Sequence, residues 1–138
     1  MDAATTGVGR VKVGDVELCH ELLGPASGPV VLLVAGLGRP LVGWDDGLCD
    51  LLVAEGYRVL RFDSRDAGRS TSIEAAPGFD LAAAFRGSAA YTLHDMADDT
   101  AGLLGALGID DAHVVGTSMG GMIGQVLAVD HPSRVRSL

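Results

Sequence analysis

The segment from Ala112 to Asp130, AHVVGTSMGGMIGQVLAVD, changes its pattern abruptly within a few residues. AHVVG is apolar in the manner of a buried strand, and MGGMIGQVLAV continues as a helix. The turn between them carries Gly116, Ser118 and Gly120 in the pattern G-x-S-x-G. A buried strand that turns sharply into a helix packed behind it is typical of layered α/β domains.

Ser118 is the candidate nucleophile. In a chain with 20 glycines the G-x-S-x-G spacing alone is a weak signal, so the surrounding strand and helix decide its interpretation. On such a turn the glycines leave room for strained backbone, and the serine hydroxyl points outward. The start of the helix places backbone N–H groups and its positive dipole beside that hydroxyl. The alternative is a structural serine in a glycine-rich turn.

The rest of the chain predicts a mixed sheet with a parallel core, in one domain spanning residues 1–138. The first two expected strands form a hairpin over 11–22 that turns at Gly14-Asp15. The later ones are the apolar PVVLLVAG at 29–36, the segment 57–63, AHVVG at 112–116, and a strand that begins in RVRSL at 134–138. One helix is expected from the helical spacing of Trp44, Leu48, Leu51 and Leu52, and Gly56 caps it. A second runs from an N-cap at Thr92 to Gly108. A third runs from Met119 to Asp130 and is closed by His131-Pro132. Residues 71–91 are the one long irregular stretch.

Composition excludes several classes of partner. The net charge is −8 and no Lys/Arg cluster reverses it locally, so the chain does not suit nucleic acid. The apolar run from Val30 to Ala35 is too short to span a membrane, and the N-terminus lacks a signal-peptide core. Cys19 and Cys49 show no metal or disulfide spacing and indicate core positions in a reducing compartment. We therefore expect a cytoplasmic protein without a metal or cofactor.

A second glycine-rich turn raises the alternative of a nucleotide-binding domain. Gly36 and Gly38 follow an apolar strand, and Asp63 ends the next one, as a dinucleotide-binding fingerprint requires. The third glycine position holds Leu41, however, and Pro40 interrupts the turn. The fingerprint is weak.

Three acidic pairs could provide paired carboxylates for acid–base chemistry. Solvated helix and loop positions explain them more simply, and the first pair suits a helix N-terminus. The pairs are Asp45-Asp46, Asp98-Asp99 and Asp110-Asp111.

Three segments together resemble the α/β-hydrolase-fold serine hydrolases, over about residues 11–138. They are VLLVAGLGRPLVGW, RVLRFDSRDAGRST, and the run from YTLHDM to the final RVRSL. The form D-x-R-D-x-G-R-S-T is most similar to the aclacinomycin methylesterase-like branch, near the cofactor-free haloperoxidases and lactone hydrolases. The resemblance implies hydrolysis of small-molecule carboxylic esters or related acyl compounds through an acyl-enzyme at Ser118.

The resemblance also assigns roles to residues around Ser118, which occupies the position of the family's nucleophile elbow. The backbone N–H groups of Met119 and Leu37 match the oxyanion-hole donors. Ala35 stands where the family usually has a histidine, but a backbone donor needs no particular side chain. The resemblance further implies that three residues brace the loop beside the nucleophile, with a structural ion pair among them: Asp63, Arg65 and Ser70.

The chain offers no partner to activate Ser118. In this fold an acid and then a histidine follow the serine, and here only Asp130 and His131 do so. They lie about 18 Å along the helix from Ser118, beyond hydrogen-bond reach. His20 and His113 are placed away from it, and His94, at a helix start, has no role implied by the resemblance.

We therefore expect the N-terminal part of an α/β-hydrolase fold, cut before its later strands. The catalytic acid and histidine would then be absent from this chain. The alternative function is that of an incomplete fragment or partner-dependent half. An uncovered sheet edge next to the Ser118 strand would favour self-association.

Overall fold

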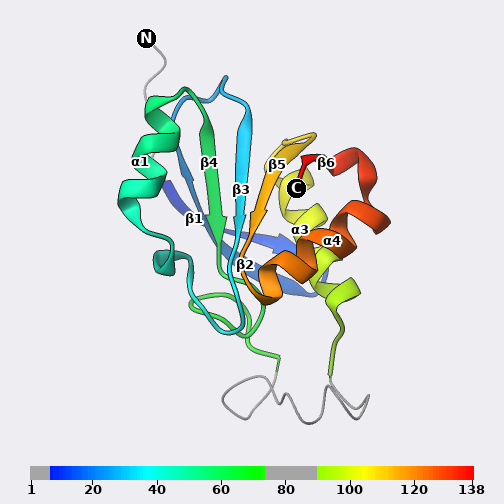
Figure 1. The fold of residues 1–138 in the computed structure, drawn as a ribbon. Coiled ribbons are helices and arrows are strands. Elements are labelled where there is room, and N and C mark those ends of the chain that lie inside the picture. Colours follow the sequence, from blue (N-terminus) through cyan, green and yellow to red (C-terminus); the bar gives the residue numbers. More distant parts are fainter. Residues whose placement is uncertain (1–6, 74–89) are drawn as a thin grey trace.

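A computed structural model describes residues 7–73 and 90–138 of the protein. The strands, shown in Figure 1, are β1 (Gly7–Val13), β2 (Val16–Leu23), β3 (Val30–Val34), β4 (Arg58–Phe62), β5 (Ala112–Gly116) and β6 (Val135–Ser137). The helices are α1 (Asp46–Ala54), α3 (Leu93–Ala106) and α4 (Met119–Asp130), with 3-10 turns η1 (Leu41–Gly43) and η2 (Pro132–Arg134).

The strands form one mixed sheet with the order β1-β2-β4-β3-β5-β6. The hairpin β1–β2 is antiparallel, with Val13 opposite Val16 at its turn, and β2 also runs antiparallel to β4. The strands β4, β3, β5 and β6 are parallel, and Leu32 in the middle of β3 pairs with both Leu60 and Val114. The expected hairpin followed by parallel βα units is confirmed.

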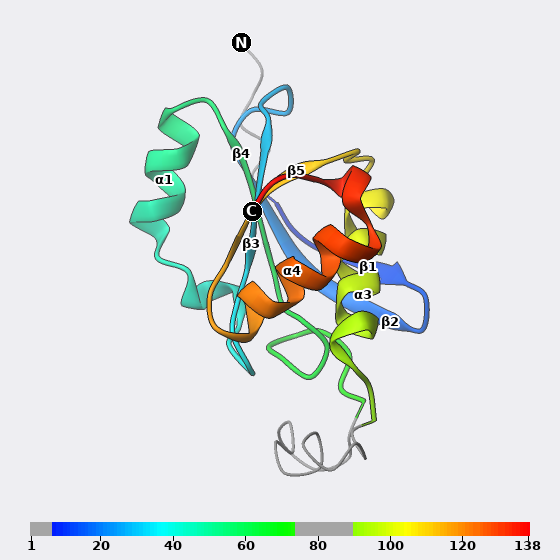
Figure 2. The ribbon, with the colours of Figure 1, turned by 45° about the vertical axis from the view of Figure 1, so that its right-hand side comes forward.

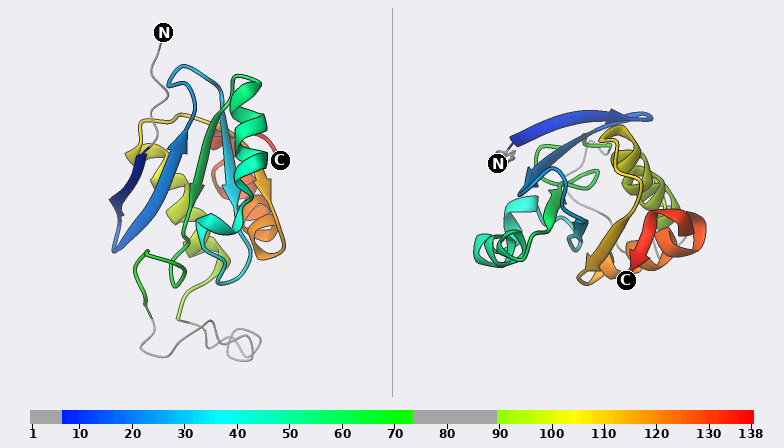
Figure 3. Two further views of the ribbon diagram at one scale, coloured as in Figure 1. Left: turned by 90° about the vertical axis from the view of Figure 1, so that its left-hand side faces the viewer. Right: turned by 90° about the horizontal axis from the view of Figure 1, so that it is seen from above.

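Helices cover both faces of the parallel strands. Figures 2 and 3 show α1 on one side of the sheet and α3 with α4 on the other. Consecutive residues of β3 point to opposite faces, so Leu32 belongs to the larger core under α3 and α4, and Leu33 to the smaller core under α1. This explains why β3 is apolar without alternation: both of its faces are buried.

The helix ends follow the local sequence signals. The Thr92 hydroxyl accepts a hydrogen bond from the Asp95 N–H, and the Asp95 carboxylate accepts one from the Thr92 N–H, which completes a capping box before α3. Asp45 caps α1 by accepting from the Leu48 N–H. Gly56 and Gly108 follow their helices with φ of 88° and 68°, the left-handed conformation that glycine favours.

The first helix begins where Asp45-Asp46 indicated, but its buried face differs from the sequence prediction. Because the Asp45 side chain caps it, α1 begins at Asp46, and Trp44 ends the preceding 3-10 turn. This start turns Cys49 toward the sheet and leaves Leu51 69% exposed, although Leu51 shares the helical spacing of the expected apolar positions.

The last strand is short, as RVRSL suggested. β6 begins at Val135 and pairs with the first residues of β5, through Ala112 with Val135 and His113 with Ser137. The second half of β5 extends past it, and Val115 is 44% exposed. The predicted irregular stretch at 71–91 lies mostly outside the described residues.

Candidate active site

The backbone at Ser118 has an unusual conformation. Its φ of 54° and ψ of −125° place it at the abrupt turn between β5 and α4. Asp66 is the other non-glycine residue with a positive φ in the described ranges. Such conformations cost on the order of 1–3 kcal/mol and are found preferentially at functional sites. The serine of the G-x-S-x-G pattern therefore lies where the sequence placed it, on a strained turn at the N-terminus of a helix.

Both glycines of the pattern are sterically required. A Cβ atom at Gly116 would lie 2.5 Å from the Gly120 carbonyl oxygen, and one at Gly120 would lie 2.0 Å from the carbonyl oxygen of Val34. The Thr117 N–H also donates to the Val34 carbonyl, at 3.2 Å. The Ser118 turn is thus pressed against the end of β3.

The loop after β3 touches the candidate nucleophile. A Cβ atom at Gly36 would lie 3.3 Å from Ser118 Cβ and 3.8 Å from Ser118 Oγ. The next residues form a tight turn, in which the Arg39 N–H donates to the Gly36 carbonyl at 3.2 Å and Gly38 has a φ of 64°. Leu37, the expected oxyanion-hole donor, is therefore the residue that follows this contact.

Three polar groups at this contact have no hydrogen-bond partner among the described residues: the Ser118 hydroxyl and the N–H groups of Leu37 and Met119. The Ser118 hydroxyl does not cap α4. Within the described residues, neither the Leu37 N–H nor the Met119 N–H donates a hydrogen bond. A hydroxyl at a helix N-terminus beside unused N–H groups is suited to an incoming carbonyl group.

The loop after β4 is held by a buried carboxylate. Asp63 is 2% exposed, and its two oxygens accept from the Leu41 N–H at 2.6 Å and the Arg69 N–H at 2.9 Å. The Ser70 hydroxyl donates to the Asp63 carbonyl at 2.6 Å and accepts from the Cys19 N–H at 2.8 Å. These contacts oppose the nucleotide-binding interpretation, because both oxygens that would hold a ribose already bind backbone.

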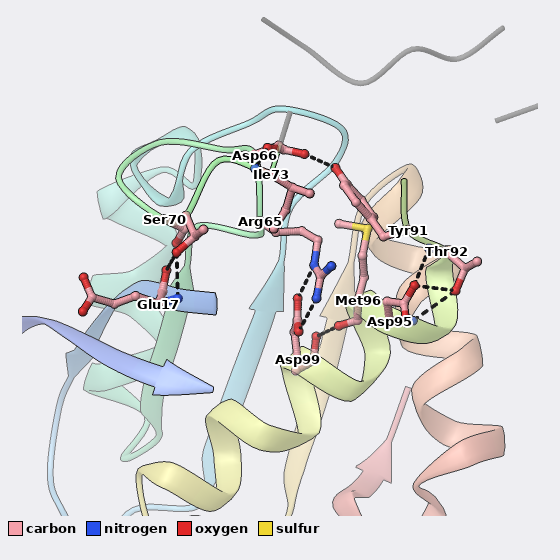
Figure 4. A network of polar contacts seen from close by, with 12 residues as sticks. Glu17, Arg65, Asp66, Ser70, Ile73, Tyr91, Thr92, Asp95, Met96 and Asp99 are labelled. Atoms are coloured by element: carbon pink, nitrogen blue, oxygen red, sulfur yellow. Dashed lines mark hydrogen bonds and ion pairs between the residues drawn. The ribbon is translucent and has the colours of Figure 1, made fainter. Parts of the chain in front are cut away.

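An ion pair joins the same loop to α3, as Figure 4 shows. The Arg65 guanidinium donates two hydrogen bonds of 2.7 Å to Asp99, and these raise the pKa of Arg65. Arg65 also lies 4.9 Å from the centre of the Tyr91 ring, whose hydroxyl donates to Asp66 at 2.6 Å. The structural ion pair expected for Arg65 is present.

Asp99 corrects the interpretation of the acidic pairs as solvated. It is 7% exposed, because it lies on the face of α3 that Arg65 covers, whereas its neighbour Asp98 is exposed. Asp45 and Asp46 do lie at a helix N-terminus, and Asp46 forms a 2.9 Å ion pair with Arg61.

None of the four histidines, all of which are described, contacts Ser118. His94 pairs with Asp130 at 2.5 Å, and His131 pairs with Asp98 at 2.6 Å, so both join α3 to α4. The two remaining histidines lie elsewhere: His113 bonds the Ser137 hydroxyl at 2.7 Å, and His20 is buried in β2. His94 approaches the end of α4, about 18 Å along the helix from the serine.

This combination of sheet, turn and helix agrees with the comparison to known families. Residues 29–138 match the family described as alpha/beta hydrolase fold. The chain belongs to this family. The resemblance noted from the sequence and the expected fold class are thereby confirmed.

Individual members of the alpha/beta hydrolase fold family are similar over most of this chain. The RutD protein of Variovorax paradoxus, named as a carbamate hydrolase, is 40% identical over 121 residues, which are 88% of this chain and 40% of that protein. Rhodomycin D methylesterase DnrP of Streptomyces peucetius is 36% identical over 127 residues, 90% of this chain and 38% of its own length. A solved hydrolase from Pseudomonas aeruginosa has a TM-score of 0.76 and 32% identity, covering 94% of this chain and 43% of that structure. This alpha/beta hydrolase chain thus spans about 40% of the length of these relatives.

A depression in the described surface of this alpha/beta hydrolase chain lies away from the Ser118 turn. An open depression of about 490 Å³ lies at the opposite end of β3 and β4, where Pro29 and Arg58 line it. In the part of the chain that the structure describes, no three His, Cys, Asp or Glu side chains gather in a way that could hold a metal ion. None of its described helices combines the length and apolar character needed to cross a bilayer.

Two contacts of the site in this alpha/beta hydrolase chain involve partners that no sequence signal identified. The bond from the Leu41 N–H to Asp63 uses a backbone donor, so no side-chain pattern announces it. The ion pair of Arg65 with Asp99 joins residues 34 positions apart, and the adjacent Asp98 offered an equally acidic partner.

The pKa of His94 provides a test of the contact between α3 and α4. The hydrogen bond that the His94 ring donates to the Asp130 carboxylate, together with the charge of Asp130 and smaller contributions from Asp98 and Asp95, raises the pKa of His94 above its ordinary value of 6.5. Its contribution to stability is therefore fully present below about pH 6.5 and is lost as the pH rises through the raised pKa. We expect NMR titration of the ring to show a pKa above 6.5, and Asp130→Asn to lower it. A wild-type His94 that titrates at or below 6.5 would contradict this arrangement.

Proposed function

We propose that Ser118 is the nucleophile of a hydrolase that acts on carboxylic esters or related acyl compounds through an acyl-enzyme. The observation that carries this proposal is the strained Ser118 turn. The φ of Ser118 is 54°, and its hydroxyl forms no capping hydrogen bond with α4. The relatives named as a carbamate hydrolase and a methylesterase support the same chemistry, because carbamates and esters both present a carbonyl group with a heteroatom leaving group.

The proposed reaction follows from the groups around Ser118. Its Oγ attacks the carbonyl carbon, its proton passes to a general base, and the carbonyl oxygen becomes an oxyanion. The N–H groups of Leu37 and Met119 stabilise that oxyanion, and the positive end of α4 adds to the field. The base returns the proton to the leaving alcohol or amine as its bond to the carbonyl carbon breaks, which gives the acyl-enzyme. Water then attacks the acyl carbon, releases the acid and restores the Ser118 hydroxyl. Labelling of Ser118 by a fluorophosphonate, in the product of the complete reading frame, tests the nucleophile directly.

The second candidate is a catalytically incomplete part of such a hydrolase. The positions of the histidines favour it, because none of them contacts Ser118. His94 and His131 instead bond to carboxylates, Asp130 and Asp98, that link α3 and α4. We propose that the general base comes from outside these 138 residues. The nucleotide sequence beyond the codon for Leu138 separates the two candidates: an in-frame continuation with an acid and a histidine supports the hydrolase, and a stop codon supports the incomplete part.

The isolated 138-residue chain should hydrolyse p-nitrophenyl acetate no faster than its own Ser118→Ala variant. Without a base within hydrogen-bond reach, the hydroxyl stays protonated and is a poor nucleophile. The release of p-nitrophenol by the two purified proteins, measured at equal concentration, checks this expectation. A burst that requires Ser118 would show that a base within the chain reaches the serine, and His94→Gln would then be the first variant to measure.

A further inference from the structure

We propose that Asp63 is a positioning residue that holds the oxyanion-hole segment, residues 36–41, in register with Ser118. This inference rests on the proposed function and extends it to a residue outside the reacting groups. Asp63 acts through the Leu41 N–H, which lies at the end of the segment that carries the Leu37 donor.

The segment has few other anchors. It leaves β3 at Gly36, against Ser118, and its tip is exposed at Leu37 (43%). The bond from the Arg39 N–H to the Gly36 carbonyl closes the turn, but both of its partners belong to the segment. At the far end of the segment the Leu41 side chain is buried (5% exposed), and the 2.6 Å bond from the Leu41 N–H to Asp63 fixes the backbone there.

The charge of Asp63 makes this connection strong. The carboxylate is 2% exposed, and within the described residues no Lys, Arg or His forms an ion pair with it. Backbone N–H groups of Leu41 and Arg69 therefore satisfy it. Hydrogen bonds to a charged acceptor are stronger than neutral ones, and a buried carboxylate that loses one is costly. The two loops that meet at Asp63 are consequently held together.

The position of Leu37 matters most in the transition state. An oxyanion-hole donor must lie about 2.7–3.1 Å from the developing oxyanion, and losing such a donor costs roughly 10²–10³-fold in kcat. The charge on that oxygen develops only as the bond forms, so a displaced donor lowers kcat more than it raises KM.

The first test uses Asp63→Asn in the product of the complete reading frame. The amide has nearly the same shape, but its NH2 group cannot accept one of the two backbone N–H groups. We expect kcat to fall about 10–100-fold with KM changed less than about threefold. The inhibition constant of a boronic acid, which places an oxygen in the oxyanion hole, should rise by a similar factor. A folded variant with kcat within about threefold of wild type, or with the whole effect in KM, would overturn the proposal.

The second test removes the donor and keeps the carboxylate. Leu41→Pro lacks the N–H, and the extended Pro40, with ψ of 163°, has the conformation that a following proline requires. Leu41→Ala is its matched control, because it shortens the side chain and keeps the N–H. We expect Leu41→Pro to lower kcat as Asp63→Asn does, Leu41→Ala to lower it much less, and the double variant Asp63→Asn/Leu41→Pro to lose no more than the larger single loss. Additive losses would contradict a shared hydrogen bond.

Two further variants separate the possible failures. Leu104→Ala, in the core under α3, should lose stability while kcat stays near wild type, which shows that destabilisation alone does not mimic the effect. If Ser118→Ala is inactive and Asp63→Asn is fully active, only the positioning role fails. If Ser118→Ala remains active, the proposed function fails and the positioning role falls with it. If neither Asp63→Asn nor Leu41→Pro folds, Asp63 is a determinant of the fold, and the proposal is overturned.

Discussion

Replacing Ser118 by alanine in the product of the complete reading frame is expected to abolish both fluorophosphonate labelling and ester hydrolysis. The reagent reacts with an activated serine hydroxyl, and the Ser118 hydroxyl lies at the N-terminus of α4, where the N–H groups of Leu37 and Met119 donate to no acceptor among the described residues. Loss of a nucleophile that acts together with its base typically lowers kcat by about 10⁴–10⁶-fold. Gel fluorescence of the labelled protein and initial rates with p-nitrophenyl esters measure the two effects.

A matched control replaces a serine outside the site, so that the effect of losing the nucleophile can be distinguished from the effect of replacing a serine elsewhere in the chain. Ser133, in η2, is exposed and lies beyond the far end of α4. Ser133→Ala should therefore keep full labelling and turnover. Ester hydrolysis retained by Ser118→Ala, at a rate close to that of Ser133→Ala, would disprove the assignment of the nucleophile.

The second large effect is expected from Gly120→Ala. The three heavy atoms nearest to the added Cβ would all be backbone atoms, at 2.0 Å for the Val34 carbonyl oxygen, 2.6 Å for the Val34 carbonyl carbon and 2.7 Å for the Ala35 carbonyl oxygen. Because β3 is paired on both sides, it cannot move aside without breaking strand pairing. We expect the free energy of unfolding to fall by about 3 kcal/mol, at the upper end of ordinary overpacking, and Ser118 labelling to be lost.

Gly121→Ala is the control for this substitution, one residue further along α4. A Cβ atom there would lie 3.5 Å from the Gly116 carbonyl oxygen, an ordinary contact. Since alanine favours a helix over glycine by about 1 kcal/mol, this variant should be as stable as wild type or slightly more stable. Urea unfolding and fluorophosphonate labelling of both variants provide the comparison. Equal behaviour of the two variants would contradict the close contact between the Ser118 turn and β3.

Features that depend on neighbouring residues could be read from the sequence. The N-cap of α3 at Thr92 and the glycine ends of α1 and α3 each depend on residues a few positions apart, so their signals are local. The Ser118 turn belongs to the same class. Its strand, glycines and helix are contiguous between Ala112 and Asp130, and the strained φ of Ser118 is a consequence of that short segment.

Only the tertiary structure decided which distant groups meet. The Leu41 N–H bonds to Asp63, 22 residues away in the sequence. Arg65 pairs with Asp99, 34 residues away, and His94 with Asp130, 36 residues away. These contacts depend on strand order and on the rotation of each helix over the sheet, which local propensity does not specify. The sequence by itself therefore determined the elements and the strained serine turn, because both arise within one short segment. The burial of Asp99, the exposure of Leu51 and the hydrogen bond from the Leu41 N–H to Asp63 were decided by packing, because each depends on which face a neighbouring element covers.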